Sequence, residues 1–386
     1  MYTQNTKVHV RLWHHDFWRL AFANLLLTMS VYMLIPFLPQ WMRMDNMSTA
    51  VVMGSYGIGL FALGGFCNYL VQRYRRNMVC VWSVAFLALT VGALYLLDIH
   101  PELKNPYVLT ALRVAMGAAF ALAQMVLAST LVIDTTESFM RTEANHSIGW
   151  FGRLAIALGP LAAWGIEALF GKSFVIVGSA ACCAVAIVLI LLVDIPFKAP
   201  EEDVSKISCD RFFLRHGLCL FLNLMLVAMA VGIILTSHTD PVFFGMMLAG
   251  FFLALFTQQL VFENAELKSE IITGLLLLGA AQLMLFSGQY VPTTFIAPAF
   301  IGLGTGIVGA RFLMFFVKLS DHCQRGTSQS TYILAWESGV AAGLFVGYAI
   351  PVSPQEMTWI SILFIVAAFL MYHLFTHSWY LNHKNR

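Results

Sequence analysis

Residues 173–195, 197–212 and 213–236 read SFVIVGSAACCAVAIVLILLVDI, FKAPEEDVSKISCDRF and FLRHGLCLFLNLMLVAMAVGIILT. The first and third segments are apolar over about the length, roughly 20 residues, that a helix needs to cross a hydrocarbon core. The segment between them is the longest polar stretch and lies near the middle of the chain. This pattern predicts two membrane-spanning helices on either side of a linker that divides the chain in two.

The whole composition extends this interpretation. Hydrophobic residues make up 59% of the chain and charged residues only 11%, whereas a soluble protein carries roughly a quarter charged residues. Most of the apolar runs also lack the polar stripe that a soluble helix needs. We therefore predict an all-α integral membrane protein with twelve transmembrane helices. The predicted spans are 18–42, 49–70, 78–97, 107–131, 145–169, 173–195, 213–236, 241–262, 270–288, 293–318, 328–350 and 358–379.

The positive charges predict how these spans are oriented, because lysine and arginine resist translocation. Segments on the same side as the N-terminus hold 16 of the 22 lysines and arginines. The loops on the other side hold only Arg43, Lys104 and Lys172. We therefore expect the protein to lie in the inner membrane of a bacterium, with both termini in the cytoplasm.

The two halves of the chain are weakly similar to each other. An offset of 187 residues superposes Gly117 on Gly304 and Asp134 on Asp321. An offset of 184 then superposes Arg153 on Glu337. Such self-similarity is typical of parallel repeats. We predict pseudo-symmetric six-helix bundles in residues 1–198 and 213–386, joined by a cytoplasmic linker over 199–212.

Four short motifs resemble the major facilitator superfamily, and the resemblance covers essentially the whole chain. They are SVYMLIPFLP with Pro36 and Pro39, NYLVQRYRRN with Arg73 and Arg76, LRVAMG with Arg113 and Gly117, and ALGPLAAWG with Gly159 and Pro160. The resemblance implies the twelve-helix fold of that family and alternating access to a central site. It is closest to the family's drug or metabolite:proton antiporters, although Gln72 replaces the acidic residue usual in the second motif.

Arg153 and Glu337 are the candidates for proton coupling. They occupy equivalent positions in the two halves, and an ionisable group inside a span is a functional candidate by default. A carboxyl group that is subject both to burial and to a nearby arginine exchanges a proton when the arginine moves. We hypothesise that Glu337 is the coupling group and that Arg153 or Arg311 modulates it. A static ion pair within the bundle is the alternative.

Other polar and aromatic residues are candidates to line a substrate cavity. Arg113 and Gln124 share one helical face, and Arg311 takes the position equivalent to Gln124 in the other half. In the resembling family the first, fourth and seventh spans line the cavity. The full set of predicted cavity residues is Arg113, Gln124, Arg311, Asn24, Tyr32, Asn223, Trp150, Tyr332 and Trp336. For each of them the alternative is a structural hydrogen bond between helices.

Two further features concern movement between the halves. Arg73, Arg76 and Asp134 are candidates for a cytoplasmic gate, and the alternative is that these arginines only set orientation. Gly339, Gly343 and Gly347 recur at four-residue intervals, a spacing that permits close helix contact. We expect them to pack against the glycines of the second span.

The function predicted from these features is secondary active transport. A membrane enzyme would need a catalytic constellation, and a sensor would usually carry a soluble domain; neither is evident in the sequence. We expect proton-coupled efflux of an amphipathic or anionic compound. Proton-coupled uptake of a polar nutrient, such as a sugar or an organic anion, is the alternative. No cofactor, metal site or nucleic-acid partner is expected, and the protein is predicted to act as a monomer in the lipid bilayer.

Overall fold

The computed structural model describes residues 11–195, 200–201, 203–260, 266–287, 291–321 and 324–384, and within these ranges it consists of helices and their connections. The predicted cytoplasmic terminus before residue 11 and the predicted boundary between residues 198 and 199 lie outside the described residues. The helices are α1 (His15–Tyr32), α2 (Leu34–Met42), α3 (Asn46–Ala62), α4 (Cys67–Arg73), α5 (Arg76–Ile99), α6 (Pro106–Val126), α7 (Val132–Asp134), α8 (Arg141–Phe170), α9 (Ser173–Leu191), α10 (Leu218–Ser237), α11 (Pro241–Leu260), α12 (Leu267–Ser287), α13 (Val291–Leu319), α14 (Arg325–Ala349), α15 (Pro354–Met371) and α16 (His377–His383).

Some of these helices continue one another and form a single span. Pro36 has no N–H to donate to the carbonyl group of Tyr32, so the first span bends between α1 and α2. The π-helical turn Leu127–Leu131 (η3) joins α6 to α7, and a second π turn, Tyr372–Thr376 (η7), joins α15 to α16. The 3-10 turn Gly64–Phe66 (η1) likewise joins α3 to α4, and with these four connections the sixteen helices named above form the twelve predicted spans.

Eleven of the spans in the described ranges are long and apolar enough to cross a membrane by themselves. The twelfth, α14, has 25 residues, and at about 1.5 Å per residue it exceeds the thickness of a hydrocarbon core. Its first four turns are almost wholly buried, including Ser328, Gln329 and Ser330. Because α10 and α3 pack along it, α14 tolerates polar side chains that a lipid-facing helix does not.

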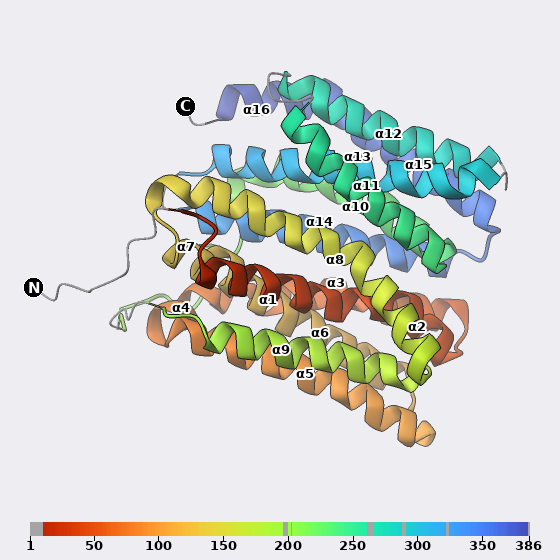
Figure 1. Ribbon diagram of the computed structural model, residues 1–386, viewed down its shortest axis with the longest axis horizontal. Coiled ribbons are helices and arrows are strands. Elements are labelled where there is room, and N and C mark those ends of the chain that lie inside the picture. The colour runs from red at the N-terminus through yellow and green to blue at the C-terminus, as the bar shows by residue number, and fades with distance from the viewer. Residues whose placement is uncertain are drawn as a thin grey trace, which may run out of the picture.

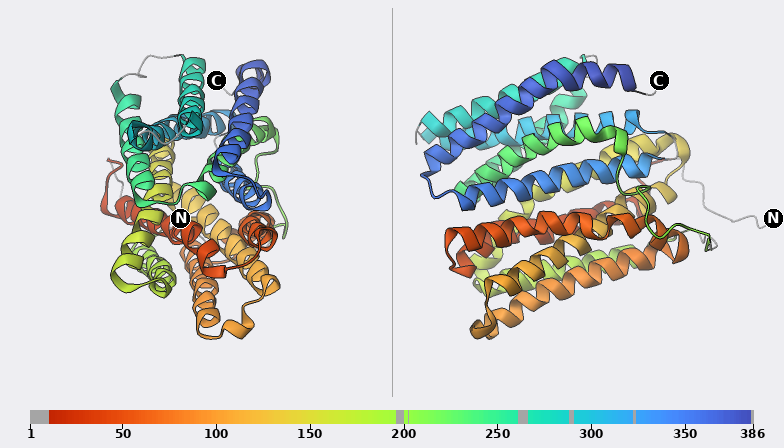
Figure 2. Two further views of the ribbon diagram at one scale, coloured as in Figure 1. Left: turned by 90° about the vertical axis from the view of Figure 1, so that its right-hand side faces the viewer. Right: turned by 180° about the vertical axis from the view of Figure 1, so that it is seen from behind.

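The helices form two groups that lie side by side. In Figure 1 the helices before residue 195 lie mainly in the lower part and those after residue 217 in the upper part, and the left view of Figure 2 shows the same division along the helix axes. The groups meet where α14 packs on α3 and where α8 packs on α11 and α13. The all-helical fold that the sequence predicted is confirmed.

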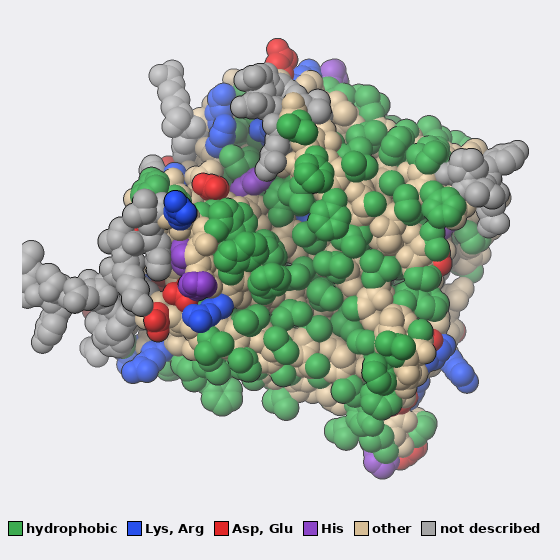
Figure 3. Space-filling model, in the orientation of Figure 1, with side chains coloured by type: hydrophobic (Ala, Val, Ile, Leu, Met, Phe, Trp, Pro, Cys, Tyr) green, Lys and Arg blue, Asp and Glu red, His purple; other side chains and the backbone are tan. Residues whose placement is uncertain are grey.

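The start of α1 and the end of α16 lie at the same end of the molecule (Figure 1). We call it the linker end, because residues 203–217 cross it between the two groups. Figure 3 shows charged and histidine side chains gathered mainly towards the ends of the visible face, while hydrophobic side chains cover the band between them. Such a distribution suits helices that cross a bilayer.

The glycines of α14 pack differently from the prediction. A side chain at Gly339 or Gly343 would meet the backbone of α10, at Met225 and Met229 respectively. Their close contact therefore lies inside the second group of helices and not at α3. The second span does meet α14 through Gly54 and Gly57, but their neighbours there are the side chains of Phe345 and Ala341.

Candidate functional site

A small cavity lies between the two groups of helices, midway along them. It has a volume of about 40 Å³, which is enough for a few water molecules. The first group contributes residues of α1, α6 and α8, and the second contributes a face of α14. We call it the central cavity. Its lining residues are Asn24, Thr28, Phe120, Gln124, Gly149, Gly152, Arg153, Ile156, Gln329, Tyr332, Ile333, Trp336 and Glu337.

Glu337 reaches this cavity from α14 and is bound by a residue of the opposite group. The hydroxyl group of Tyr32 in α1 donates a hydrogen bond to Oε1 of Glu337 at 3.2 Å. Nε1 of Trp336 donates to the same tyrosine oxygen at 3.1 Å. Glu337 is only 5% exposed. The carboxyl group is therefore held by a contact that crosses from one half to the other.

Arg153 reaches the cavity from α8 and is also held across the interface. Its Nη1 donates to the hydroxyl group of Tyr332 in α14 at 3.1 Å, and its guanidinium lies over the ring of Trp150 at 4.2 Å. The side chain is 3% exposed. Among the residues that the structure describes, Arg153 and Glu337 form no ion pair with each other. Each is bound to a tyrosine of the other half instead.

Four more predicted residues line the central cavity. Gln124 lines the central cavity and donates to Thr28 at 2.8 Å. Asn24 lines it and donates to the carbonyl group of Ile148 at 3.1 Å. Tyr332 and Trp336 line it as well. Thr28 was missed by the sequence analysis, although it follows Asn24 by one helical turn and so lies on the same face.

Other predicted cavity residues lie elsewhere. Asn223 donates to the carbonyl group of Ala368 at 3.0 Å, which is the interhelical bond that was its alternative interpretation. Arg113 is buried over the ring of Tyr56 at 5.0 Å and is not among the lining residues. Trp150 and Arg311 line a separate, larger cavity of about 730 Å³ between α8, α11 and α13.

Arg311 has a partner that the sequence analysis did not identify. Its Nε donates to Oε2 of Glu270 at 2.7 Å, and its Nη2 binds Oε1 of the same carboxylate. Glu270 is fully buried in the first turn of α12. Glu270 is thus a buried carboxylate that the sequence analysis did not single out. Glu270 was overlooked because it stood at the first position of a predicted span.

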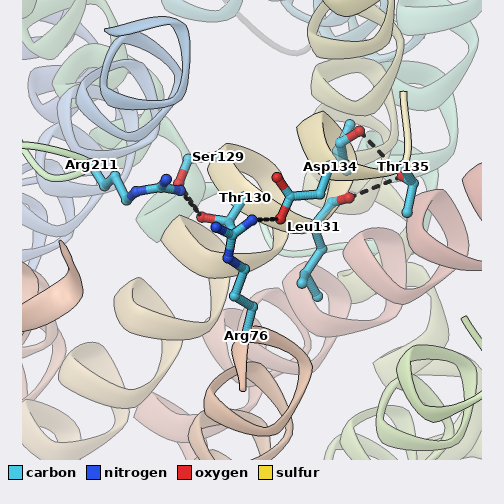
Figure 4. Close-up of polar contacts among 8 residues, drawn as sticks. Arg76, Ser129, Thr130, Leu131, Asp134, Thr135 and Arg211 are labelled. Atoms are coloured by element: carbon cyan, nitrogen blue, oxygen red, sulfur yellow. Dashed lines mark hydrogen bonds and ion pairs between the residues drawn. The ribbon is translucent and has the colours of Figure 1, made fainter. Parts of the chain in front are cut away.

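The predicted gate residues lie at the linker end. Arg76 forms an ion pair with Asp134, which joins the start of α5 to the end of α7. Figure 4 shows Arg76 and Arg211 reaching the same stretch, Ser129–Asp134, from different elements. Arg73 lies exposed at the end of α4. The ion pair between the two predicted gate residues Arg76 and Asp134 therefore links two helices of the first group.

The linker itself connects the two groups. Nη1 of Arg211 donates to Oγ1 of Thr130 in η3 at 2.7 Å, and its backbone N–H donates to Oγ1 of Thr327 in α14 at 2.8 Å. The backbone N–H of Leu214 donates to Oγ1 of Thr331 at 2.8 Å. These hydrogen bonds fix the linker against η3 and the start of α14. Nothing in its polar sequence predicted them.

Comparison with known proteins relates this geometry to a family. Residues 20–259 match the family model of the Major Facilitator Superfamily. No curated protein matches the sequence at a significant level. Among solved structures, the chain is similar to the POT family transporter PepTSo, with a TM-score of 0.71, 11% identity, and coverage of 96% of this chain and 99% of that one.

Two further solved structures have the same fold. The nucleoside transporter NupG gives a TM-score of 0.64 at 12% identity, over 92% of this chain and 99% of that one. The human organic anion transporter MFSD10 gives 0.63 at 14% identity, over 92% and 98%. At such low identity these similarities concern the fold alone.

Proposed function

The chain belongs to the major facilitator superfamily and is therefore a membrane transporter rather than an enzyme, and we propose that it carries a small molecule through the central cavity by alternating access, coupled to protons. In this proposal the two groups of helices rock about the cavity and open it to each side of the membrane in turn. Its residues come from both groups, so any such movement rearranges the site.

The observation that carries proton coupling is the position of Glu337. An ionisable side chain inside a membrane costs about 2.5–3.5 kcal/mol on insertion scales, so its presence needs a functional reason. Its carboxyl group is buried at the interface and bound to Tyr32 from the other half. When the halves separate, that hydrogen bond is lost and the surroundings of the carboxyl group change. A carboxyl group in altered surroundings has an altered proton affinity.

Arg153 supports an amphipathic or anionic substrate, because it is a cation in a cavity that also has the apolar surfaces of Phe120 and Trp336. Export is the direction favoured by the resemblance of the Pro36–Pro39 and Gly159–Pro160 motifs to those of antiporters. Uptake of a polar nutrient is the second candidate. It is favoured by the polar cavity residues Asn24, Gln124 and Gln329, which suit a ligand with several hydrogen-bonding groups.

We place the linker end in the cytoplasm of a bacterial cell and the protein in the inner membrane. Arg73, Arg75 and Arg76 all lie at that end, as the excess of positive charge on the cytoplasmic side requires. We further propose that a single copy of the chain is sufficient for transport, because the central cavity is lined by residues of both of its halves.

The test is transport into proteoliposomes with an imposed pH gradient, across a panel of drugs, sugars and organic anions. Glu337→Gln should lose the acceleration by the gradient but retain exchange of substrate between the two sides. Glu102→Gln, at an exposed position, is the matched control and should behave as wild type. Full gradient dependence in Glu337→Gln would overturn the coupling role. Whether the gradient drives accumulation or expulsion decides between uptake and export.

A further inference from the structure

The guanidinium group of Arg153 is buried with one edge unused. Nη1 binds Tyr332, but in the described part of the chain neither Nε nor Nη2 has a hydrogen-bond partner. These two nitrogens carry parallel N–H groups on the same edge of the planar fork. A buried donor without a partner costs about 1–3 kcal/mol, and more when it is charged. The site is therefore poised for an acceptor with two oxygens side by side.

In Arg311 the same two nitrogens, Nε and Nη2, do have hydrogen-bond partners. Its Nε and Nη2 bind the two oxygens of the Glu270 carboxylate. Such a bidentate pair is the strongest arrangement between a guanidinium and a planar anion. No carboxylate plays this part for Arg153, because Glu337 accepts its hydrogen bond from Tyr32 instead.

The other polar groups of the central cavity add a second requirement. Oδ1 of Asn24 and Oε1 of Gln329 both lie buried, and within the described ranges neither has a donor. The Nδ2 group of Asn24 is already bound to a backbone carbonyl, which fixes its oxygen as the free end of the amide. The cavity thus offers two acceptors in addition to the cationic edge. Phe120, Ile156 and Trp336 supply apolar surface between these groups.

We propose that the central cavity binds a carboxylate that also carries a hydroxyl or amino donor, with the carboxylate on the Nε–Nη2 edge of Arg153. This inference rests on the proposed function, since a cavity of about 40 Å³ admits such a ligand only when the two halves separate. The donor of the ligand binds Asn24 or Gln329, and its apolar part packs against Trp336. The ring of Trp150 and the hydroxyl group of Tyr332 both contact the guanidinium and hold it in place.

Three related probes separate these contributions. Mandelate has the carboxylate, a hydroxyl group and a ring; mandelamide replaces the carboxylate by a neutral amide; phenylacetate lacks the hydroxyl group. Binding is measured with the full-length protein in detergent as a ligand-dependent rise in the midpoint of thermal unfolding. Wild type should bind mandelate more tightly than either of the other two compounds.

Variants then assign the preference to Arg153. Arg153→Lys keeps the charge but loses the fork and should weaken mandelate binding about tenfold; Arg153→Gln should weaken it about a hundredfold. Neither change should affect mandelamide. Arg75→Gln removes an exposed arginine and serves as the matched control. If Arg153→Gln does not fold, Arg153→Lys alone decides, because its length and charge are close to those of the original residue.

The proposal is overturned if wild type binds mandelamide as well as mandelate, if it binds none of the three probes, or if Arg153→Lys retains the full preference for the carboxylate. Because the assay uses no pH gradient, its result is independent of proton coupling. Carboxylate binding that depends on Arg153, together with transport that ignores the gradient, would refute only the coupling role of Glu337. Gradient-driven transport of a neutral compound, with no carboxylate bound, would refute only this inference.

Discussion

The closest helix contact in the first group gives a prediction about stability. Gly59 of α3 lies against the backbone of α6: a Cβ atom added there would come within 2.1 Å of the carbonyl oxygen of Val114 and 3.0 Å of the backbone nitrogen of Ala118. Both neighbours are backbone atoms and cannot rotate away. The approach of 2.1 Å is more than 1 Å short of an ordinary contact of about 3.5 Å, so Gly59→Ala forces α3 and α6 apart.

The size of the effect follows from that displacement. A gap of about 0.5–1 Å already forfeits a quarter to a half of the dispersion attraction between facing atoms, and overpacking typically costs about 1–3 kcal/mol. The higher helix propensity of alanine offsets at most about 1 kcal/mol of this loss. We therefore expect a net loss of at least about 1 kcal/mol. Gly92→Ala is the matched control, because nothing lies within 4 Å of its added Cβ atom. It should be neutral or slightly stabilising.

The assay is thermal unfolding in detergent, followed by a thiol-reactive fluorogenic dye. Cys67 and Cys80 are fully buried, so the dye reports the loss of tertiary packing. Gly59→Ala should lower the midpoint by a few degrees relative to Gly92→Ala. Equal midpoints for the two variants would refute the close approach of α3 and α6.

Three further outcomes follow from the contacts. Tyr32→Phe removes the hydroxyl group that donates to Glu337, worth about 1–2 kcal/mol. Gradient-driven transport should fall several-fold with an altered pH–rate profile; an unaltered profile counts against the contact. Glu270→Gln leaves Arg311 unpaired, and since that side chain is 20% exposed we expect a loss of about 2–4 kcal/mol of stability. Replacing both partners by leucine and methionine should restore most of it, and failure to do so contradicts the paired arrangement. Thr130→Val removes the acceptor of the linker guanidinium, worth about 1 kcal/mol, so limited proteolysis should cut the linker several-fold faster. A wild-type cleavage rate would argue against its docked position.

The helices were predictable because each follows from a local rule. A span requires about 20 apolar residues, and the polar breaks between spans are short and frequent. That Arg153 and Glu337 line the same cavity was also predictable, because the offset of 184 residues makes their positions equivalent in the two halves. Equivalent positions on inward faces meet when two similar bundles pack together.

Partners across helices were not predictable, because they depend on which helix covers a given face. The glycines of α14 were expected at α3, but Gly343 packs against α10. Periodicity identifies a small-residue face without naming its neighbour. The burial of Glu270 was not predicted for a different reason. It depends on α13, which brings Arg311 to the first turn of α12. A residue at the end of a span looks solvated in the sequence whatever covers it in the fold.

The two tyrosine contacts explain how the cavity could link movement to charge. Arg153 of the first group is bound to Tyr332 of the second, and Glu337 of the second is bound to Tyr32 of the first. Both hydrogen bonds cross the same interface, so the rocking movement that we propose must break them together. The guanidinium and the carboxyl group are then released at the same moment, each with a lost partner in a medium of low dielectric constant. Attraction between the opposite charges is strong there. In the separated state that admits the ligand, Glu337 and a substrate carboxylate would therefore compete for the guanidinium of Arg153, which would make substrate binding depend on the charge of Glu337.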